Sequence, residues 1–386
     1  MRQTKLRLGI FLAPFHGLNE NPTLCFERDL EFTQYADELG LSEFWFGEHH
    51  TGGYEIISSP ELMIAAAAQR TKRIKLGTGV VSLPYHNPLN TASRIAQLDH
   101  LTRGRLMFGA GPGLLTADAY IRGLDARESR DKLDQGLSVI TRLLRGEWVT
   151  EKTDWYDLRE AHCQLLPTAP LEVCVASAMS PNGGALAGKY AGGMLCLAAT
   201  IYNGFDALAA NWQVAQETAA TYGRVMNPGS IRLVTDMHIA ETREQARANV
   251  RYGLAQWADY FGRVNPMAPR DTSGKDLVDQ LIDNSGVVIG TPDDAIAKLE
   301  ALQAKQGEFG AFLQLATNWA DFEATKKSYD LFARFVRPHF TGANVNRRAS
   351  LDWVTDNGGE LSTKVRDAAM KAFVAHEVAQ KAKAGA

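Results

Sequence analysis

Residues 43–50 read Glu43-Phe44-Trp45-Phe46-Gly47-Glu48-His49-His50, a short apolar run that leads into three side chains capable of acid–base chemistry. Apolar runs of this kind alternate with longer amphipathic runs along the chain, which is typical of repeated βα units and a parallel sheet. Eight such units predict a closed (β/α)8 TIM barrel. The eight expected strands are Arg7–Pro14, Glu43–Gly47, Ile74–Gly79, Leu106–Gly109, Leu171–Ala176, Gly193–Leu197, Ile231–Ala240 and Phe309–Leu315.

The amphipathic runs between these strands predict an outer layer of helices. Thr291 followed by Pro292 and two aspartates marks the start of one of them. The expected helices include Leu24–Leu39, Pro60–Arg70, Leu89–Leu101, Ala126–Leu144, Gly204–Tyr222, Glu241–Gly262 and Thr291–Lys305.

Domain organisation follows from where this rhythm breaks. We assign residues 1–340 to the barrel and residues 341–386 to a C-terminal extension that ends in a helical tail, Leu361–Ala384. The stretches 150–170 and 263–286 are too long for ordinary βα connections, so we expect insertions there, and the second is a candidate lid. The tail is expected to pack on the outside or against a partner subunit.

Composition limits the function classes. The 386 residues are 45% hydrophobic, which suits one large core, and 41 basic against 44 acidic residues give no field that would attract a nucleic acid or a membrane. Four cysteines without a CxxC pair indicate reduced, buried thiols. The apolar stretch Leu8–Pro14 is too short for a signal peptide or a spanning helix. We expect a cytoplasmic enzyme with a small-molecule partner and neither a nucleic-acid nor a membrane partner.

Three polar or glycine-rich segments follow expected strands directly. They are Glu48-His49-His50 after the second strand, Gly109–Gly113 after the fourth, and Ser177–Gly184 after the fifth. Because the active site of a βα barrel lies at the carboxyl ends of its strands, we expect all three segments at one mouth.

The paired histidines allow more than one interpretation. Neighbours in an extended segment face opposite ways, and no HxH or HExxH motif accompanies His49 and His50, so we expect no metal site. One of the two could be a capped core histidine. The reading we favour is a hydrogen-bond donor or base in the pocket.

The two glycine- and serine-rich segments are also open to a plain structural reading. Gly109–Gly113 is not a dinucleotide fingerprint; its glycines let a flat ring lie against the backbone, or they only form tight turns. Ser177 and Ser180, with a helix that starts near Asn182, form a phosphate cradle or only a helix cap.

Three stretches together resemble the bacterial luciferase family of flavin monooxygenases. They are FWFGEHH at residues 44–50, LGTGVVSLPYHNP at residues 76–88 and LDHLTRGR at residues 98–105. The resemblance covers roughly residues 6–340. Within the family, residues 59–88 and 108–120 are most similar to members of the limonene 1,2-monooxygenase type.

The resemblance implies roles for single residues. His49 would handle a proton and stabilise the flavin peroxide, and His50 would lie beside it in the pocket wall. Asp118 would lie near the flavin ring, and Arg130 would contact the FMN phosphate. A cis peptide bond would join Gly79-Val80 beneath the isoalloxazine.

The chain also departs from luciferase after the fourth strand. A cysteine and a phosphate-binding arginine of luciferase are replaced here by Gly111 and Pro112. Phosphate recognition would therefore rest on Arg130 and on the loop after the fifth strand. Further residues expected to contact the cofactor are Gly111, Ala176, Ser177, Ala178, Met179 and Ser180.

The activity that the resemblance implies is that of a two-component monooxygenase. Reduced FMN (FMNH2), supplied by a separate NAD(P)H:flavin reductase, would react with O2 to give a C4a-peroxyflavin. One oxygen atom would then enter a small apolar substrate, such as a terpene or a cyclic ketone, by epoxidation or Baeyer–Villiger chemistry. The resemblance also implies a homodimer. An F420-dependent oxidoreductase and a non-catalytic flavin-binding protein are the alternatives on this fold.

Overall fold

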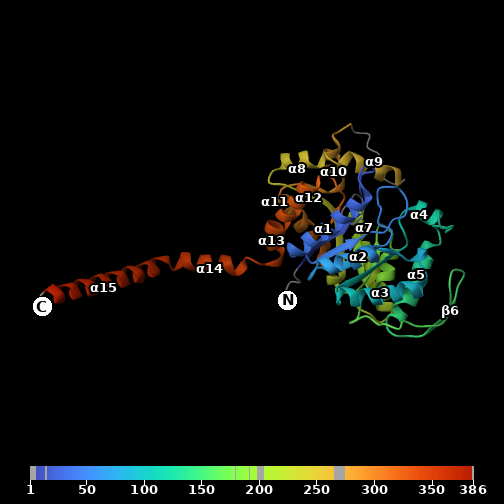
Figure 1. Cartoon of the computed structure of the whole chain (residues 1–386), viewed down its shortest axis with the longest axis horizontal. Helices are drawn as coiled ribbons and strands as arrows, with labels where there is room; N and C mark the ends of the chain where they lie inside the picture. Colours follow the sequence, from blue (N-terminus) through green and yellow to red (C-terminus); the bar gives the residue numbers. More distant parts are fainter. Residues whose placement is uncertain are drawn as a thin grey trace. The chain divides into compact units, whose positions relative to one another are not determined.

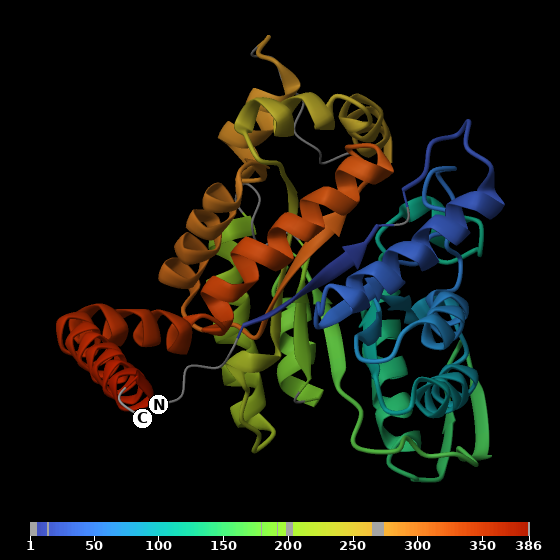
Figure 2. The same cartoon turned by 60° about the vertical axis from the view of Figure 1, so that its left-hand side comes forward.

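Eight parallel strands close into a barrel in the computed structural model (Figures 1 and 2). Neighbouring strands pair in the order β1, β2, β3, β5, β8, β9, β10, β12, and β12 pairs with β1 to complete the ring. The (β/α)8 TIM barrel is therefore confirmed, and each expected strand overlaps one of the eight. Their bounds are β1 Arg7–Leu12, β2 Glu43–Phe46, β3 Lys75–Thr78, β5 Leu106–Gly111, β8 Val173–Ser177, β9 Gly193–Cys196, β10 Ile231–Ile239 and β12 Ala311–Ala316.

The structure describes residues 6–13, 15–178, 180–190, 192–197, 204–264 and 274–384. The chain divides into two compact units, with the boundary between Phe340 and Thr341. The first unit contains the barrel. The second contains two helices, α14 (Val345–Asp356) and α15 (Gly358–Ala384), and none of their residues is buried.

Helices cover the outside of the barrel (Figure 2). Several begin at a side-chain cap followed by proline: Asn21 accepts from the amide of Thr23, and Thr291 forms a capping box with Asp294. No described helix is both long and apolar enough to cross a bilayer. Their bounds are α1 Pro22–Glu38, α2 Pro60–Arg70, α3 Pro88–Thr102, α4 Thr116–Tyr120, α5 Ser129–Leu143, α6 Asn182–Tyr190, α7 Gly204–Thr221, α11 Pro292–Gln306, α12 Phe322–Leu331 and α13 Arg337–Thr341.

Two hydrophobic clusters lie on either side of the strands. Because side chains alternate along a strand, Phe44 and Phe46 of β2 join the cluster beneath the helices, whereas Trp45 joins the one inside the barrel. The same alternation on β10 places Val234 inside. The expectation of reduced, buried thiols is confirmed, since all four cysteines are buried and free.

A buried ion pair lies inside the barrel at the amino ends of the strands. Arg232 Nε of β10 donates to Glu43 Oε2 of β2 at 2.7 Å, and both side chains are fully buried. Glu43 also accepts from Arg7 Nε at 2.7 Å and from Trp45 Nε1 at 3.0 Å. Burial alone would raise the pKa of Glu43, but Arg232 and Arg7 hold that pKa below its usual value.

One expected helix was wrong in its extent. Glu241–Gly262 is split into α8 (Arg243–Val250) and α9 (Leu254–Val264). Gly253 lies at the break, where its amide donates to the Trp319 carbonyl oxygen at 2.8 Å and a Cβ would collide with the backbone of Asn318. The helix is interrupted because the chain packs closely here on the loop that follows β12.

Both expected insertions contain regular structure. The first includes an antiparallel hairpin of β6 (Val149–Lys152) and β7 (Asp157–Ala161). Of the second, residues 265–273 lie outside the described part, and α10 (Leu277–Ser285) leads to β11 (Val288–Gly290), which pairs with β10. Helices α8, α9 and α10 share a hydrophobic cluster with β11 and lie together in Figure 1. A further short strand, β4 (Val81–Ser82), pairs with β5.

We predict that Arg232→Met lowers the free energy of unfolding by about 3–5 kcal/mol, because it leaves the carboxylate of Glu43 buried without its main partner. Urea unfolding measures this. Arg334→Met, at the exposed ion pair with Asp330, is the matched control and should cost less than about 1 kcal/mol. Equal losses of unfolding free energy in the two variants would show that the buried ion pair stabilises the fold no more than the exposed one.

Candidate functional site

The carboxyl end of β2 is bonded to the segment that follows β3. Gly79 N donates to the Phe46 carbonyl oxygen at 2.6 Å, and Ser82 N donates to Glu48 Oε2 at 2.7 Å. The peptide bond between Gly79 and Val80 is cis, as the resemblance implied. The histidine segment and the Gly79-Val80 segment therefore lie side by side on one rim of the barrel.

The ends of β5 and β8 complete the same rim. Gly111 lies so close to its neighbours that an added Cβ would collide with Val80 and approach the Cβ of Ala176 to 3.3 Å. Ala110 and Val175 are paired residues of β5 and β8. The structure thus gathers all four segments near positions 48, 79, 110 and 177 at one end of the barrel.

His49 lies between two carboxylates on this rim. Its Nδ1 is 3.2 Å from Asp118 Oδ2, and its Nε2 is 3.6 Å from Glu55 Oε2. Asp118, in the short helix α4, is itself fixed by two hydrogen bonds to its Oδ1. Thr51 Oγ1 donates to this atom at 2.5 Å, and His50 N donates to it at 3.2 Å. The imidazole is oriented from both of its nitrogens.

The carboxylates decide the charge of His49. Burial on its own would lower the pKa of the imidazole, but Glu55, Asp118 and Glu48 outweigh it and raise that pKa. Asp118 shows the reverse, since burial would raise its pKa and the bonds from His49 and Thr51 lower it. The pair therefore favours a protonated imidazole beside an ionised carboxylate.

His50 faces the other way and shares a carboxylate with a second histidine. His50 Nε2 and His86 Nε2 both lie within 2.9 Å of Glu48 Oε1. Burial would raise the pKa of Glu48, but the two imidazoles and the amide of Ser82 lower it to about 2. A carboxylate that accepts from both rings fixes each histidine as a donor at Nε2.

Tyr85 packs beside these two groups. Its ring lies edge-on to His50 at 6.1 Å and beneath the guanidinium of Arg122 at 4.6 Å. Burial, and after it the charges of Asp118 and Glu48, raise the pKa of Tyr85 to about 12. Its phenol therefore keeps its proton at neutral pH.

The loop after β8 leads directly into α6. Ser177 is buried, and its Oγ accepts from Asn211 Nδ2 at 3.3 Å, while the same amide donates to the Ala178 carbonyl oxygen at 2.8 Å. Ala178 and Ser180 are exposed next to the start of α6. The Ser177 hydroxyl is thus bonded to Asn211 within the protein. The exposed residues Ala178 and Ser180 are the part of the loop that a ligand could contact.

The structure brings most of the expected site residues together. His49, His50 and Asp118 form one bonded group. Arg130 is exposed in the first turn of α5, the second helix after β5, and its contact with a phosphate stays a prediction. Met179 lies outside the described residues. The remaining expected residues on the rim are Gly79, Val80, Gly111, Ala176, Ser177, Ala178 and Ser180.

Three residues of the site were not identified from the sequence. His86 entered the resemblance only as part of LGTGVVSLPYHNP, although a histidine in the segment that follows the third expected strand was a signal that could have drawn attention. Glu55 and Tyr260 carry no motif, and only folding brings them together, because the Tyr260 hydroxyl on α9 donates to Glu55 Oε2 at 2.6 Å. Among the residues that the structure describes, no group of three or more His, Cys, Asp or Glu could hold a metal ion.

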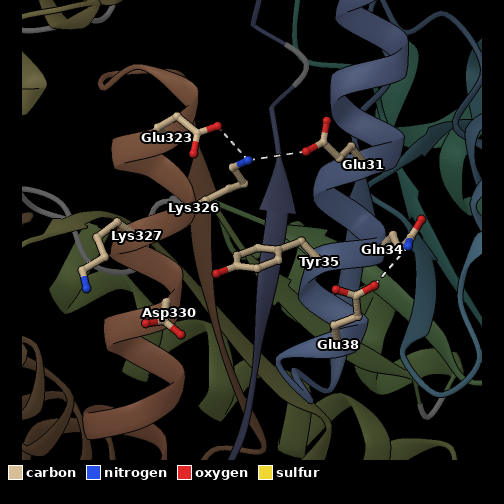
Figure 3. Close-up of a pocket in the computed structure, with 8 residues that line it drawn as sticks. All are labelled: Glu31, Gln34, Tyr35, Glu38, Glu323, Lys326, Lys327 and Asp330. Carbon is tan, nitrogen blue, oxygen red and sulfur yellow. Dashed lines mark hydrogen bonds and ion pairs between the residues drawn. The ribbon is translucent and has the colours of Figure 1, made fainter.

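A groove of about 500 Å³ lies elsewhere, between the outer helices α1 and α12 (Figure 3). Its charged groups bind one another: Lys326 reaches Glu323 at 2.7 Å and Glu31 at 3.5 Å. Such a charged lining does not suit an apolar molecule. The lining residues are Glu31, Gln34, Tyr35, Glu38, Glu323, Lys326, Lys327 and Asp330.

Comparison with known proteins finds similar sequences over most of the chain. The sequence model of a family described as luciferase-like monooxygenase matches residues 6–307. The chain is 46% identical to limonene 1,2-monooxygenase of Rhodococcus erythropolis, over 88% of this chain and 87% of the relative. It is 42% identical to 4-hydroxyprotoasukamycin monooxygenase of Streptomyces nodosus subsp. asukaensis, over 91% and 97%.

A solved structure shares the fold. It is the oxygenating constituent of 3,6-diketocamphane monooxygenase from Pseudomonas putida, a type II Baeyer–Villiger monooxygenase in complex with FMN. The TM-score is 0.72 and the identity 23%, and the similarity covers 86% of this chain and 98% of that one.

We predict that Glu48→Gln lowers the free energy of unfolding by about 1.5–3 kcal/mol at pH 7, because two imidazoles and an amide lose a charged acceptor. The pKa of Glu48 falls from 4.5 to about 2 on folding, so its stabilisation is complete above pH 4.5 and fades as the pH drops toward 2. Urea unfolding at pH 7 and pH 3 should show a smaller loss at pH 3. A loss of the same size at both pH values would contradict this.

Proposed function

This chain belongs to the luciferase-like monooxygenase family, and from that premise we propose that it is a flavin-dependent oxygenase of a two-component system. Reduced FMN comes from a separate NAD(P)H:flavin reductase, and one oxygen atom of O2 is placed on a small apolar substrate. The observation that supports this most is His49, held between two carboxylates on the rim that also carries Gly79-Val80 and Gly111.

The residues inside this rim fit a flat heterocycle. Val80, Gly111 and Ala176 are small or apolar and pack against one another, and the ring would lie on them. Asp236 faces the barrel interior from β10, and its Oδ1 is buried without a partner. Burial raises the pKa of Asp236 to about 7, so its carboxyl can donate as well as accept. A flavin would offer a ring face to these apolar groups and polar edge atoms to such a carboxyl.

The phosphate of FMN would lie at the outer edge of the same rim. Arg130 supplies a charged, planar donor that can bind a phosphate in a bidentate manner. The start of α6 supplies backbone N–H groups that lack partners within the helix, next to the hydroxyl of Ser180. Both groups are exposed, as a phosphate that enters from solvent requires.

The side chains of the rim hold protons and keep water out. Reduced flavin, when bound, supplies the electrons that activate O2. His49, kept protonated by Asp118 and Glu55, is a donor at either nitrogen and can release or retake one proton. His50 is held by Glu48 in the adjoining wall. The apolar interior around Phe11 limits the access of water to the reacting groups.

The substrate we propose is apolar, with a terpene-like molecule or a cyclic ketone as the first choice. The interior cluster beneath the rim is built from Phe11, Leu195, Leu313 and similar groups, which leave few polar anchors for a hydrophilic substrate. The names of two of the similar proteins point the same way, because limonene is a terpene and diketocamphane a cyclic ketone.

We predict that His49→Ala still binds FMN but separates oxygen consumption from product formation, since the proton donor beside the flavin is lost. Product and hydrogen peroxide are measured with terpenes and cyclic ketones, in the presence of FMN, NADH, a flavin reductase and ¹⁸O2. His162→Ala, at an exposed histidine, is the control and should behave as the wild type.

Two results would count against the proposal. Unchanged coupling in His49→Ala would remove His49 from the reaction. Failure of the wild-type protein to bind FMN, with no ¹⁸O in any product, would contradict the oxygenase assignment itself.

For Arg130→Ala we predict that FMN binding weakens by about 1–3 kcal/mol, because a bidentate, charge-assisted contact is lost. Fluorescence titration with FMN measures the affinity. Arg145→Ala, beyond the other end of α5, is the matched control and should leave the affinity unchanged. Equal affinities in both variants would exclude the contact.

A further inference from the structure

The second carboxylate on His49 comes from a loop rather than from a strand end. Glu55 Oε2 is 3.6 Å from His49 Nε2, and the side chains of the two residues are only 12% and 14% exposed. With Asp118 at Nδ1, each nitrogen of the ring faces a carboxylate oxygen. This arrangement favours a ring that carries both N–H protons.

The loop is shaped so that Glu55 returns to His49. Gly52 and Gly53 both have positive φ angles, 86° and 80°, which turn the chain back after Thr51. Phe15 and Glu55 then form an isolated antiparallel bridge. A Cβ at Gly52 would come within 3.0 Å of the Tyr260 hydroxyl oxygen, so the glycine also makes room for that side chain.

Tyr260, on α9, holds Glu55 from the far side. Its hydroxyl donates to the same Oε2 atom that faces His49, at 2.6 Å. Its ring packs 4.9 Å from that of Tyr54 and 5.4 Å from that of Phe15, and the side chain is almost fully buried. Burial, and after it the charge of Glu55, raise the pKa of the phenol, so it remains a donor at neutral pH.

We propose that Glu55 and Tyr260 are positioning residues for the proton on His49: Glu55 keeps the imidazole charged, and Tyr260 fixes Glu55 at that distance. The placement of α9 is thereby linked to the charge of a residue on the barrel rim. The effect of these residues on turnover rests on the proposed function. The electrostatic interaction between Glu55 and His49 does not, because it involves only groups of this chain.

Other charged groups around His49 also affect its protonation, and their effects must be distinguished from that of Glu55. Asp118 on α4 and Glu48 at the end of β2 also act on its charge, and Tyr85 lies near both. The charge of Glu55 raises the pKa of His49, as do the hydrogen bond to Asp118 and the charges of Asp118 and Glu48. Removing the charge of Glu55 should therefore move the titration of His49 further than any change at a distant carboxylate.

The experiment is an NMR titration of the flavin-free, full-length protein labelled in its 9 histidines, with the His49 signal assigned by its loss in His49→Gln. Glu55→Gln should lower the titration midpoint of His49 by about one pH unit or more, because an opposite charge is lost. Tyr260→Phe keeps that charge but frees Glu55 to move away, so the midpoint should fall by a smaller amount. Glu38→Gln and Tyr252→Phe, at exposed sites, are the matched controls and should not move it.

In turnover, the sign follows from the direction of the shift. Protonated His49 is present below its pKa, so a lower pKa should move the alkaline limb of coupled product formation to lower pH in Glu55→Gln. An unchanged His49 midpoint in Glu55→Gln would overturn the whole inference, and one unchanged only in Tyr260→Phe would overturn the role of Tyr260. Because the titration needs neither flavin nor substrate, these results are independent of the oxygenase test.

Discussion

The pairing of Arg232 with Glu43 is the constraint on which the rest of the barrel depends. Two full charges lie inside the strand ring, and each stabilises the other across 2.7 Å. Arg232 also donates to Glu172 Oε1 at 2.8 Å. Arg7 and Trp45 use the remaining acceptor positions of Glu43. With the amino end closed in this way, apolar side chains fill much of the middle of the barrel, and the residues of the candidate site lie at the carboxyl end.

At the carboxyl end, buried charges are also paired with opposite charges, and there the paired groups belong to the candidate site. Asp118 lies beside one nitrogen of His49 and Glu55 beside the other. Glu48 accepts hydrogen bonds from His50 and His86. Burial would favour neutral imidazole, but three carboxylates outweigh it at His49. The difference between the two ends is reversibility, because a guanidinium keeps its proton while an imidazole can give one up near neutral pH.

The strands, the closed barrel and the rim were predictable because each depends on local pattern or on a general rule of βα folds. The apolar run within Glu43–Gly47 predicts a strand from local pattern alone. The rule that the active sites of βα barrels lie at the carboxyl ends of the strands then places His49 on the rim. The contact of Tyr260 with Glu55 joins residues 205 positions apart, and no local signal encodes it. The break at Gly253 escaped prediction for the same reason, because it follows from packing on the loop after β12. The role of Arg130 stays a prediction.

We propose that one rim of the barrel receives a single flat cofactor beside His49. A crystal structure of the protein with FMN would test this. We expect the ring system to lie against Val80, Gly111 and Ala176, with an edge within hydrogen-bond distance of His49 or Asp236. A flavin bound elsewhere, such as in the charged groove between α1 and α12, or a rim whose side chains leave no room for it, would show that the rim is not the flavin site.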